Sequence, residues 1–327
     1  MKKNIAILRG GDSSEIAISL KSADVVYKHI DTEYYTPYIV HIEGKDWAVI
    51  HENQSYPIDR NDFSFSIEKE KICFEGVFMA IHGTPGEDGI LQAYFDLLNI
   101  PYNCCGSFEA AITFNKAMCN ALLKQFNILS AKAIIINKGA EYNLDIIQNE
   151  IGLPCFVKPN RAGSSFGISK VTETNQWEDA IAYAFKYDEQ VIIEAFIDGT
   201  EVTCGLIEKE GELISLPLTE ITTENDFFDY EAKYEGKAEE ITPARINDEN
   251  SDQIQLISKN IYRTLKLKGI VRMDYIIENK QAFLIEINTI PGLSEESIIP
   301  QQAQCYGMSL KELFSISIEN MFSHDKA

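Results

Sequence analysis

Glu286 and Asn288 form a pair of side chains in this 327-residue sequence whose types and spacing suggest chemistry. They stand two residues apart in the apolar run 283-FLIEINTIPG-292, which ends at a Pro-Gly turn. Residues two apart in a strand share one face, so a strand here points both side chains the same way. An unpaired carboxylate on a buried strand face is costly, so another group must compensate the charge of Glu286.

The preceding apolar run, IVRMDYII, carries Arg272 and Asp274 at the same spacing. If the two runs form a hairpin with Asp274 opposite Glu286, then Arg272 falls opposite Asn288 and all four side chains line one face. This register requires an odd number of residues in the turn near 278–280, or a bulge in a strand. A simple two-residue turn without a bulge would send the two pairs to opposite faces.

Carboxylate and amide oxygens that converge on one point suit Mg²⁺, which completes its shell with water and substrate phosphates. The sequence therefore predicts a metal site at this face. The alternative is an edge hairpin with one solvated face. Phosphates held by a metal also need basic groups, and Lys158 ends the apolar run of FVKPNRAGSSFG, whose small-residue turn could cover a polyphosphate with its N–H groups. The Walker pattern GxxxxGK[ST] is absent from the sequence.

The composition favours a small-molecule partner. Fifty acids against 29 bases give a formal net charge of −21, which repels nucleic acid and anionic membrane surfaces. With 45% hydrophobic residues the chain can bury a large core. The start, MKKNIAILRGG, contains an apolar run too short for a signal peptide or a membrane span, so we expect a first strand there.

The seven cysteines show no zinc-ligand spacing and no disulfide framework, which favours the reducing cytoplasm. Two of them are adjacent, Cys104 and Cys105. They are either a redox pair or two small residues in a loop.

The element pattern predicts three units. Short apolar runs alternate with helices through 1–105, which is typical of a parallel α/β domain with ligands at the carboxyl ends of its strands. Residues 106–190 read as a small α+β unit around the glycine-rich turn. Residues 191–327 read as a second α+β unit that holds the acidic face and a polar, aromatic segment, TTENDFFDYEAKYEGKAEEIT.

Taken together, these segments resemble the ATP-grasp superfamily, and within it the D-alanine–D-alanine ligases. The resemblance covers nearly the whole chain, in the order expected for the family. It is carried by RGGDSSEIAISLKSA, HGTPGEDG, FVKPNRAGSSFGISKV, IIEAFIDGTEVT, DYEAKY, VRMDYII and IEINTIPGLSEESIIP. The resemblance implies an ATP-grasp fold of mixed α/β and α+β class, with an N-terminal parallel α/β domain, a central small α+β domain and a C-terminal α+β domain.

The resemblance implies four residues for the two amino-acid substrates. Glu15 would hold the ammonium group of the first D-alanine, and His82 would lie beside that subsite. Gly292 and Ser297 would bind the carboxylate of the second D-alanine, partly through a backbone N–H. Without the resemblance, Glu15 would be an acid favouring a helix start and His82 a structural histidine capping a loop.

For the nucleotide, the resemblance implies that Lys116 and Lys158 contact the phosphates of ATP, and that Glu194 and Glu201 bind the adenine and ribose end. It also implies a lid over the substrates, where Ser164 of the glycine-rich turn meets Tyr234. Three further expectations concern this lid and the reaction centre. Lys233 would belong to the lid, Arg272 would stabilise the oxyanion, and Glu15, Ser164, Tyr234 and Arg272 would form the catalytic set.

Asp274, Glu286 and Asn288 would ligate two Mg²⁺ ions, which Mn²⁺ could replace. The implied reaction joins two D-alanines through an acyl phosphate and releases ADP and phosphate, for peptidoglycan precursor synthesis. The implied setting is a homodimer in a bacterial cytoplasm, without nucleic-acid or membrane partners. Two alternatives stay open: a ligase of different acceptor specificity, such as D-alanine–D-lactate or another dipeptide, and a nucleotide-binding regulator without catalysis.

This sequence departs from the usual pattern of the family at several positions. Ala162 and Phe166 replace an acid and a smaller residue in the glycine-rich turn, and we expect these changes to alter how that turn packs. Ala195 stands where a lysine is frequent near adenine, and Phe228 where a tyrosine is common beside the lid. None of these changes removes an expected catalytic group.

Overall fold

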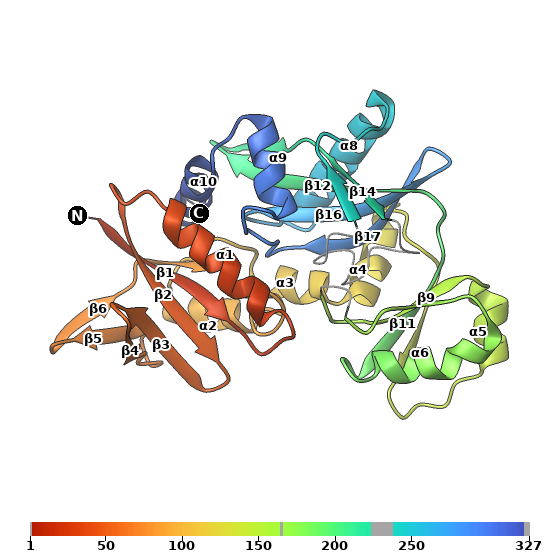
Figure 1. Ribbon diagram of the computed structural model, residues 1–327, viewed down its shortest axis with the longest axis horizontal. Coiled ribbons are helices and arrows are strands. Elements are labelled where there is room, and N and C mark those ends of the chain that lie inside the picture. Colours follow the sequence, from red (N-terminus) through yellow and green to blue (C-terminus); the bar gives the residue numbers. More distant parts are fainter. Residues whose placement is uncertain (1, 164–165, 224–237, 324–327) are drawn as a thin grey trace.

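The structure is a computed structural model that describes residues 2–163, 166–223 and 238–323. Three sheet-containing parts follow one another along the chain (Figure 1). The N-terminal part and the central part lie at opposite ends of the long axis, and the C-terminal part lies between and above them. No helix among the described residues is long and apolar enough to cross a membrane.

The N-terminal part is built on a five-stranded sheet in the order β4-β3-β2-β1-β7. Strand β1 pairs in parallel with β2 and β7, as the sequence predicted, whereas β3 and β4 extend the sheet antiparallel and β5 and β6 form a separate hairpin. The elements are β1 Lys3–Gly10, α1 Ile16–His29, β2 Tyr35–Glu43, β3 Asp46–His51, β4 Gln54–Pro57, β5 Ser64–Ile67, β6 Glu70–Cys73, β7 Gly76–Met79 and α2 Ile90–Leu98.

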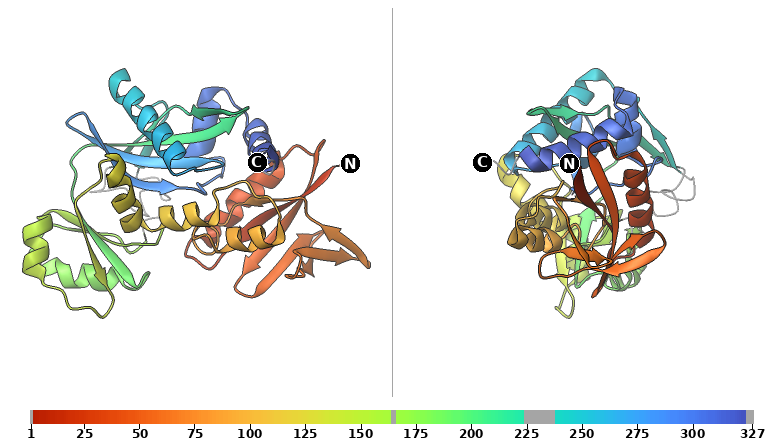
Figure 2. Two further views of the ribbon diagram at one scale, coloured as in Figure 1. Left: turned by 180° about the vertical axis from the view of Figure 1, so that it is seen from behind. Right: turned by 90° about the vertical axis from the view of Figure 1, so that its left-hand side faces the viewer.

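Two short helices, α3 and α4, lead from this part to the central sheet, and Figure 2 shows them running between the two parts. The central sheet is antiparallel, in the order β10-β9-β11-β8, and α5 and α6 pack on it. The elements are α3 Ser107–Phe114, α4 Lys116–Leu123, η1 Lys124–Phe126, β8 Ala133–Asn137, α5 Leu144–Ile151, β9 Cys155–Pro159, β10 Ser169–Val171, η2 Thr174–Gln176, α6 Trp177–Ala184 and β11 Gln190–Ala195.

The C-terminal part holds an antiparallel sheet in the order β15-β14-β12-β16-β17, with β13 paired to β12. Strands β16 and β17 pair with each other along nearly their whole length and carry the predicted acidic face. The elements are β12 Thr200–Lys209, β13 Glu212–Ser215, β14 Thr219–Thr223, β15 Ala238–Ile241, α8 Asp248–Thr264, β16 Val271–Glu278, β17 Gln281–Asn288, α9 Ile298–Tyr306 and α10 Leu310–Ser323.

The register of β16 and β17 confirms the predicted pairing. Asp274 lies opposite Glu286 and Arg272 lies opposite Asn288. The turn has two residues, Asn279 and Lys280, both with positive φ, so the turn alone would not give this register. A bulge supplies it, because Tyr275 pairs with Leu284 and the intervening Ile285 has no opposite partner.

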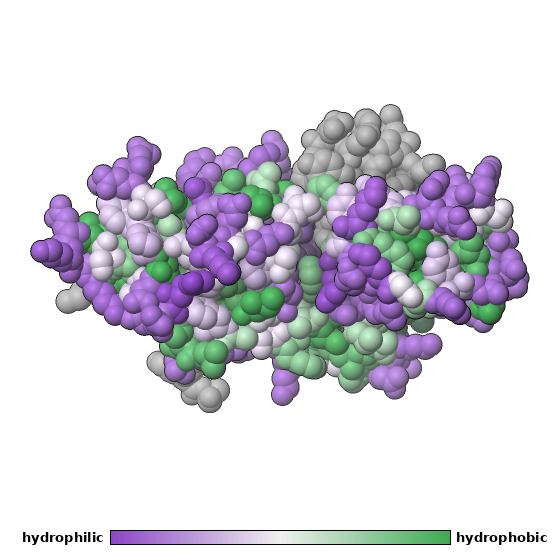
Figure 3. Space-filling view, turned by 90° about the horizontal axis from the view of Figure 1, so that it is seen from below, coloured by the Kyte–Doolittle hydropathy of each residue, from purple (hydrophilic) through white to green (hydrophobic). Residues whose placement is uncertain are grey.

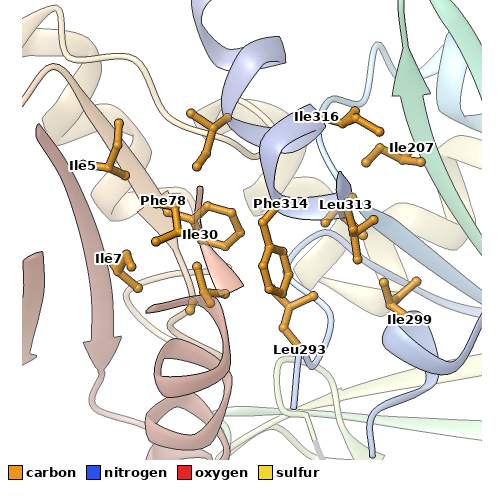
Figure 4. Close-up of a cluster of buried hydrophobic side chains, with 14 of the residues drawn as sticks. Ile5, Ile7, Ile30, Phe78, Ile207, Leu293, Ile299, Leu313, Phe314 and Ile316 are labelled. Atoms are coloured by element: carbon orange, nitrogen blue, oxygen red, sulfur yellow. The ribbon is translucent and has the colours of Figure 1, made fainter. Parts of the chain in front are cut away.

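The N-terminal and C-terminal parts share one hydrophobic core. It combines Ile5 and Ile7 of β1 with residues of α9 and α10, and the rings of Phe78 and Phe314 meet edge to face with centroids 5.8 Å apart (Figure 4). The central part has its own cluster of buried residues around Trp177. The central part therefore has a hydrophobic core of its own.

All seven cysteines have free thiols. Cys104 and Cys105 are buried. Burial raises the pKa of Cys105 to about 12 and also raises the pKa of the Cys104 thiol. A thiol that stays protonated is a poor nucleophile, so the structure favours two small packed residues over a redox pair.

Candidate active site

Two cavities share a wall: the first lies between the N-terminal and C-terminal parts, and the second lies between the central sheet and the C-terminal sheet. The first has a volume of about 490 Å³ and the second about 510 Å³. The residues common to both linings are Lys116, Ala162, Gly163, Arg272 and Glu286. A ligand in one cavity is therefore separated from a ligand in the other only by side chains of the shared wall.

The predicted site residues divide between the two cavities according to their expected ligands. Those expected for the amino acids line the first cavity, and those expected for the nucleotide line the second, whereas the three predicted metal ligands are distributed over both. The first cavity holds Glu15, His82, Asn288, Gly292 and Ser297. The second holds Lys158, Glu194, Glu201 and Asp274. Lys116, Arg272 and Glu286 face both. Ser164, Lys233 and Tyr234 lie outside the described residues, as does Phe228 among the departures.

Glu15 is the residue before α1 and is buried against the glycine-rich turn. A Cβ atom placed on Gly163 would come within 2.5 Å of a Glu15 carboxylate oxygen, so only glycine allows this approach. The hydroxyl of Ser13 accepts the backbone N–H of Glu15 and donates to the carbonyl of His82. These contacts fix the start of α1 next to the strand end that carries His82.

Both ring nitrogens of His82 are engaged. Nδ1 lies 2.8 Å from the carbonyl oxygen of Ile290, and Nε2 lies 3.0 Å from the hydroxyl of Ser22. Since a carbonyl can only accept, Nδ1 carries the proton and Nε2 accepts from Ser22. Burial lowers the pKa of His82, which keeps the ring neutral. The Ser22 hydroxyl also accepts the N–H of Leu293, so His82 and Ser22 together hold the loop between β17 and α9.

That loop supplies the far end of the first cavity. Ser297 is the residue before α9, and its hydroxyl lies 2.7 Å from the hydroxyl of Ser294. A Cβ atom on Gly292 would lie 2.9 Å from the Ser297 hydroxyl. The N-terminus of a helix favours negative charge, so this end of the cavity suits a carboxylate.

In the second cavity, Lys158 of β9 and Glu194 of β11 form a buried ion pair with Nζ 2.5 Å from Oε2. Asn160, two residues after Lys158, accepts the N–H of Ala117 and donates to Asn115, which caps α4. The start of α4 is thereby tied to the end of β9. This arrangement explains why Lys116 and Lys158, 42 positions apart in the sequence, both reach the second cavity.

Apolar side chains also line the second cavity, among polar ones. They come from the central and the C-terminal parts and suit the apolar faces of a bound planar group. They include Phe156, Ile168, Phe196, Ile276 and Leu284. Ala195 lines this cavity too, so the departure from lysine leaves a small apolar side chain at the site.

The shared wall concentrates charge. Arg272 donates two hydrogen bonds to Asp274, at 2.9 and 2.8 Å, and its guanidinium lies 3.9 Å from Glu286. Lys116 lies 3.2 Å from Glu286 and donates to the carbonyl of Ala162 at 2.8 Å. Although burial opposes it, the charge of Glu286 raises the pKa of Lys116, and the carboxylates of Asp274 and Glu286 do the same for Arg272. Both cations therefore stay charged.

Glu87, in the HGTPGEDG segment, is a site residue that the sequence analysis did not single out. Its carboxyl group is buried and lines the first cavity. Burial, together with the charges of Glu15 and Glu286, raises the pKa of Glu87 to about 8. The signal for it was present, because this acid lies within a glycine-rich turn that follows a strand, but burial cannot be read from such a turn.

Glu240 is a second residue that was missed. It lies in β15, lines the first cavity and accepts a hydrogen bond from Gln301 at 2.9 Å. Its charge contributes to the raised pKa of Arg272. No sequence motif marks it, because it lies near the end of the polar, aromatic segment 222–242, where acids are frequent.

The oxygen atoms at the shared wall fit a divalent metal. Asp274 and Glu286 face each other across β16 and β17, and Asn288 adds an amide from the same face. Within the described ranges, no three His, Cys, Asp or Glu side chains gather closely enough to hold a metal by themselves. Two carboxylates and an amide leave ligand positions for water and phosphate oxygens, which is the arrangement that Mg²⁺ prefers.

Two family models match most of the chain. The family described as D-ala D-ala ligase N-terminus matches residues 4–105, and the family described as D-ala D-ala ligase C-terminus matches residues 122–319. A D-alanine–D-alanine ligase of Flavobacterium johnsoniae is 51% identical over 318 residues, covering 97% of this chain and 98% of that protein. One from Bacteroides fragilis is 48% identical over 324 residues, covering 98% and 100%.

Solved structures match over the same length. The VanG D-Ala:D-Ser ligase from Enterococcus faecalis is 31% identical with a TM-score of 0.86, and the match covers 98% of this chain and 100% of that one. D-alanyl-alanine synthetase A from Vibrio cholerae is 27% identical with a TM-score of 0.88, covering 98% and 99%.

Proposed function

The chain belongs to the D-alanine–D-alanine ligase family, and we propose that it joins two D-alanines to D-alanyl-D-alanine with ATP, through an acyl phosphate, releasing ADP and phosphate. The observation that carries this proposal is the wall shared by the two cavities. An amino-acid carboxylate in the first cavity and a nucleotide phosphate in the second would meet at Lys116, Arg272 and Glu286.

In the first cavity, Glu15 would hold the ammonium group of the first D-alanine beside His82. Because His82 is neutral and engaged at both ring nitrogens, its role would be to position the loop that carries Gly292 rather than to transfer a proton. The carboxylate of the second D-alanine would lie at the N-terminus of α9, near Gly292 and Ser297, where the helix dipole favours it.

In the second cavity, the phosphates of ATP would contact Lys116 and Lys158, and the adenine and ribose would lie towards Glu194 and Glu201. Asp274, Glu286 and Asn288 would hold two Mg²⁺ ions, which Mn²⁺ could replace. When bound, the divalent metal neutralises charge on the phosphates. Ser164, Lys233 and Tyr234 remain proposed members of the lid and the catalytic set.

The chemistry proposed for Arg272 follows from its charge. A carboxylate is a poor electrophile, so it is first phosphorylated, and the amine of the second D-alanine then attacks the acyl phosphate. The tetrahedral intermediate carries an oxyanion that needs a fixed positive group. Arg272 remains charged and is held by Asp274, which makes it suited to this role. Collapse of the intermediate expels phosphate.

We further propose that the product supplies peptidoglycan precursor synthesis in a bacterial cytoplasm, with ATP and D-alanine as small-molecule partners and no nucleic-acid or membrane partner. A homodimer is part of this proposal. Exposed apolar side chains on α2 and α3, Ile90, Leu97 and Phe108, are candidates for its contact surface. Apolar areas are visible among hydrophilic ones on the face seen from below (Figure 3).

For the domain division we propose three units, with the first boundary after residue 105 as the sequence predicted and the second after Ala195 in place of the predicted boundary between 106–190 and 191–327. The reason is that β11 pairs with β8 and β9 of the central sheet.

Phosphate release from ATP and Mg²⁺ tests the proposed function when it is measured with D-alanine, L-alanine, D-serine and D-alanine plus D-lactate, and the products are identified by mass. We expect release and dipeptide with D-alanine alone. The D-serine arm matters because one structural neighbour is a D-Ala:D-Ser ligase. Reaction of another pair would overturn the acceptor assignment, and no release with any pair would favour a nucleotide-binding regulator. Glu286→Gln should abolish release in a folded protein.

A further inference from the structure

Glu87 has two hydrogen-bond contacts that no proposed role explains. It is 6% exposed, and its Oε2 accepts the N–H of Gly83 at 2.9 Å. Its own N–H donates to the carbonyl of Gly83, so the turn 83–87 is closed by both ends of the residue. This leaves Oε1 directed at the end of β17.

The partner of Oε1 is the side-chain amide of Asn288. With its nitrogen towards Glu87 and its oxygen towards Arg272, the amide makes hydrogen bonds of 3.1 Å and 2.8 Å. The opposite orientation would set the amide oxygen against a carboxyl oxygen and the amide nitrogen against a guanidinium. Only one orientation of Asn288 therefore satisfies both neighbours.

We propose that Glu87 is a positioning residue that fixes the Asn288 amide with its oxygen on the side of Arg272, Asp274 and Glu286. This inference rests on the proposed metal site, because that oxygen is the only atom of the Asn288 side chain that can ligate a metal. An amide rotated by half a turn would present an N–H₂ group there instead. A residue that orients a ligand in this way typically changes metal affinity by roughly tenfold to a hundredfold when it is replaced.

The contact pattern explains why the position needs a carboxyl group. In its ionised form, which a divalent metal nearby favours, Glu87 has two acceptor oxygens for two donors, the N–H of Gly83 and the amide nitrogen of Asn288. A glutamine has the same size but only one acceptor oxygen. If that oxygen accepts from Gly83, the glutamine N–H₂ faces the N–H₂ of Asn288, and the orientation of Asn288 is no longer held.

The test is the affinity for Mn²⁺, measured by the loss of its free-ion paramagnetic resonance signal in the presence of ADP. This readout does not depend on turnover. We expect Glu87→Gln to weaken Mn²⁺ binding by roughly tenfold to a hundredfold relative to the unaltered protein. Thermal unfolding of each variant is measured alongside.

A matched control is Asp88→Asn, the same change of carboxyl to amide in the same turn. Asp88 interacts with the hydroxyl of Thr84 and the N–H of Ile90, has no contact with Asn288 and lines neither cavity. Asp88→Asn should keep the Mn²⁺ affinity of the unaltered protein.

Restoring the donor–acceptor match gives the sharper test. In the double variant Glu87→Gln/Asn288→Asp, the glutamine N–H₂ donates to the new carboxylate. In Asn288→Asp alone, two carboxyl groups face each other and must either repel or share a proton, and both effects oppose the geometry of the unaltered protein. We therefore expect the double variant to bind Mn²⁺ more tightly than Asn288→Asp alone. This comparison carries the test even if Glu87→Gln alone does not fold.

The outcomes separate the two levels of the proposal. If the unaltered protein with ADP binds no Mn²⁺, the proposed metal site falls and this inference falls with it. If it binds Mn²⁺ but Glu87→Gln binds equally well, the positioning role of Glu87 is overturned while the metal site stands. The same conclusion follows if Glu87→Gln changes the Mn²⁺ affinity by the same factor whether position 288 holds asparagine or aspartate.

Discussion

Lys158 and Glu194 are diagonal neighbours on paired strands of the central sheet, with Nζ 2.5 Å from Oε2 and only 7% and 9% of their side chains exposed. Lys158→Met would leave Glu194 buried without this partner. We expect the free energy of unfolding to fall by about 3–5 kcal/mol, because breaking a buried ion pair at one side leaves an uncompensated charge. Urea denaturation measures this change.

The double variant Lys158→Met/Glu194→Leu should recover most of that stability without recovering affinity for ADP. The apolar pair packs without a buried charge, but Lys158, one of the two lysines proposed for the phosphates, is lost. Calorimetric titration with ADP and Mg²⁺ checks the second point. An exposed pair, Lys138 with Glu189, is the control, and Lys138→Met should change stability by less than about 1 kcal/mol. Unchanged stability in Lys158→Met would count against the buried pair.

Arg272→Lys should lower kcat by roughly 10²–10³ while leaving the KM for ATP close to its original value. A lysine keeps the charge but cannot make the two-pronged contact with Asp274 that aims the guanidinium. Steady-state kinetics separate kcat from KM. Arg245→Lys, which alters a similar two-pronged contact with Glu220 outside the shared wall, is the control. A change in KM alone would refute the oxyanion role.

Gly163→Ala should raise the KM for D-alanine by roughly tenfold or more, because the added methyl group would displace the Glu15 carboxylate. Since both changes act through one carboxylate, Gly163→Ala should add little to the effect of Glu15→Gln. The measurement is a double-mutant cycle of D-alanine kinetics. Fully additive effects would mean that Gly163 acts elsewhere.

The protein should lose stability at alkaline pH through its buried thiols. Burial raises the pKa of Cys204 from 9.0 to about 12 in the folded state, so the unfolded chain releases this proton first as pH rises. The stabilisation is fully present below pH 9 and is lost progressively as pH rises from 9 towards 12. The urea concentration at the midpoint of unfolding, determined at several pH values between 7 and 11, measures this loss of stability.

The matched comparison is between Cys204→Ala and Cys73→Ala. Cys73 is exposed, so its replacement should leave the slope of stability against pH unchanged, whereas Cys204→Ala should flatten it. The same slope in both variants would contradict the assignment to the buried thiol.

Much of the site could be predicted from strand patterns. The spacing of Arg272 and Asp274 against Glu286 and Asn288 predicted the shared face and the pairing that the structure has. The need for a bulge or an odd turn was also predicted, but not its position at Ile285, because a bulge depends on how both strands pack on their neighbours.

Other features could not be predicted for definite physical reasons. The burial of Glu87 depends on β17, about 200 positions away in the chain, so its own segment reads as a solvated turn. The strands between 46 and 73 have only four to six residues each and mix polar with apolar side chains. Segments this short contain too few repeats of a polar–apolar alternation to be distinguished from loops.

The shared wall links the affinities of the two cavities for their ligands. Lys116 and Glu286 touch both cavities, so any ligand that reorients this pair changes the free energy of binding at the other cavity. Such coupling is reciprocal by thermodynamic necessity: if nucleotide increases the affinity for the first amino acid by some factor, the amino acid increases the affinity for nucleotide by the same factor. The two substrates of this fold are then effectors of one another, with no separate regulatory site required.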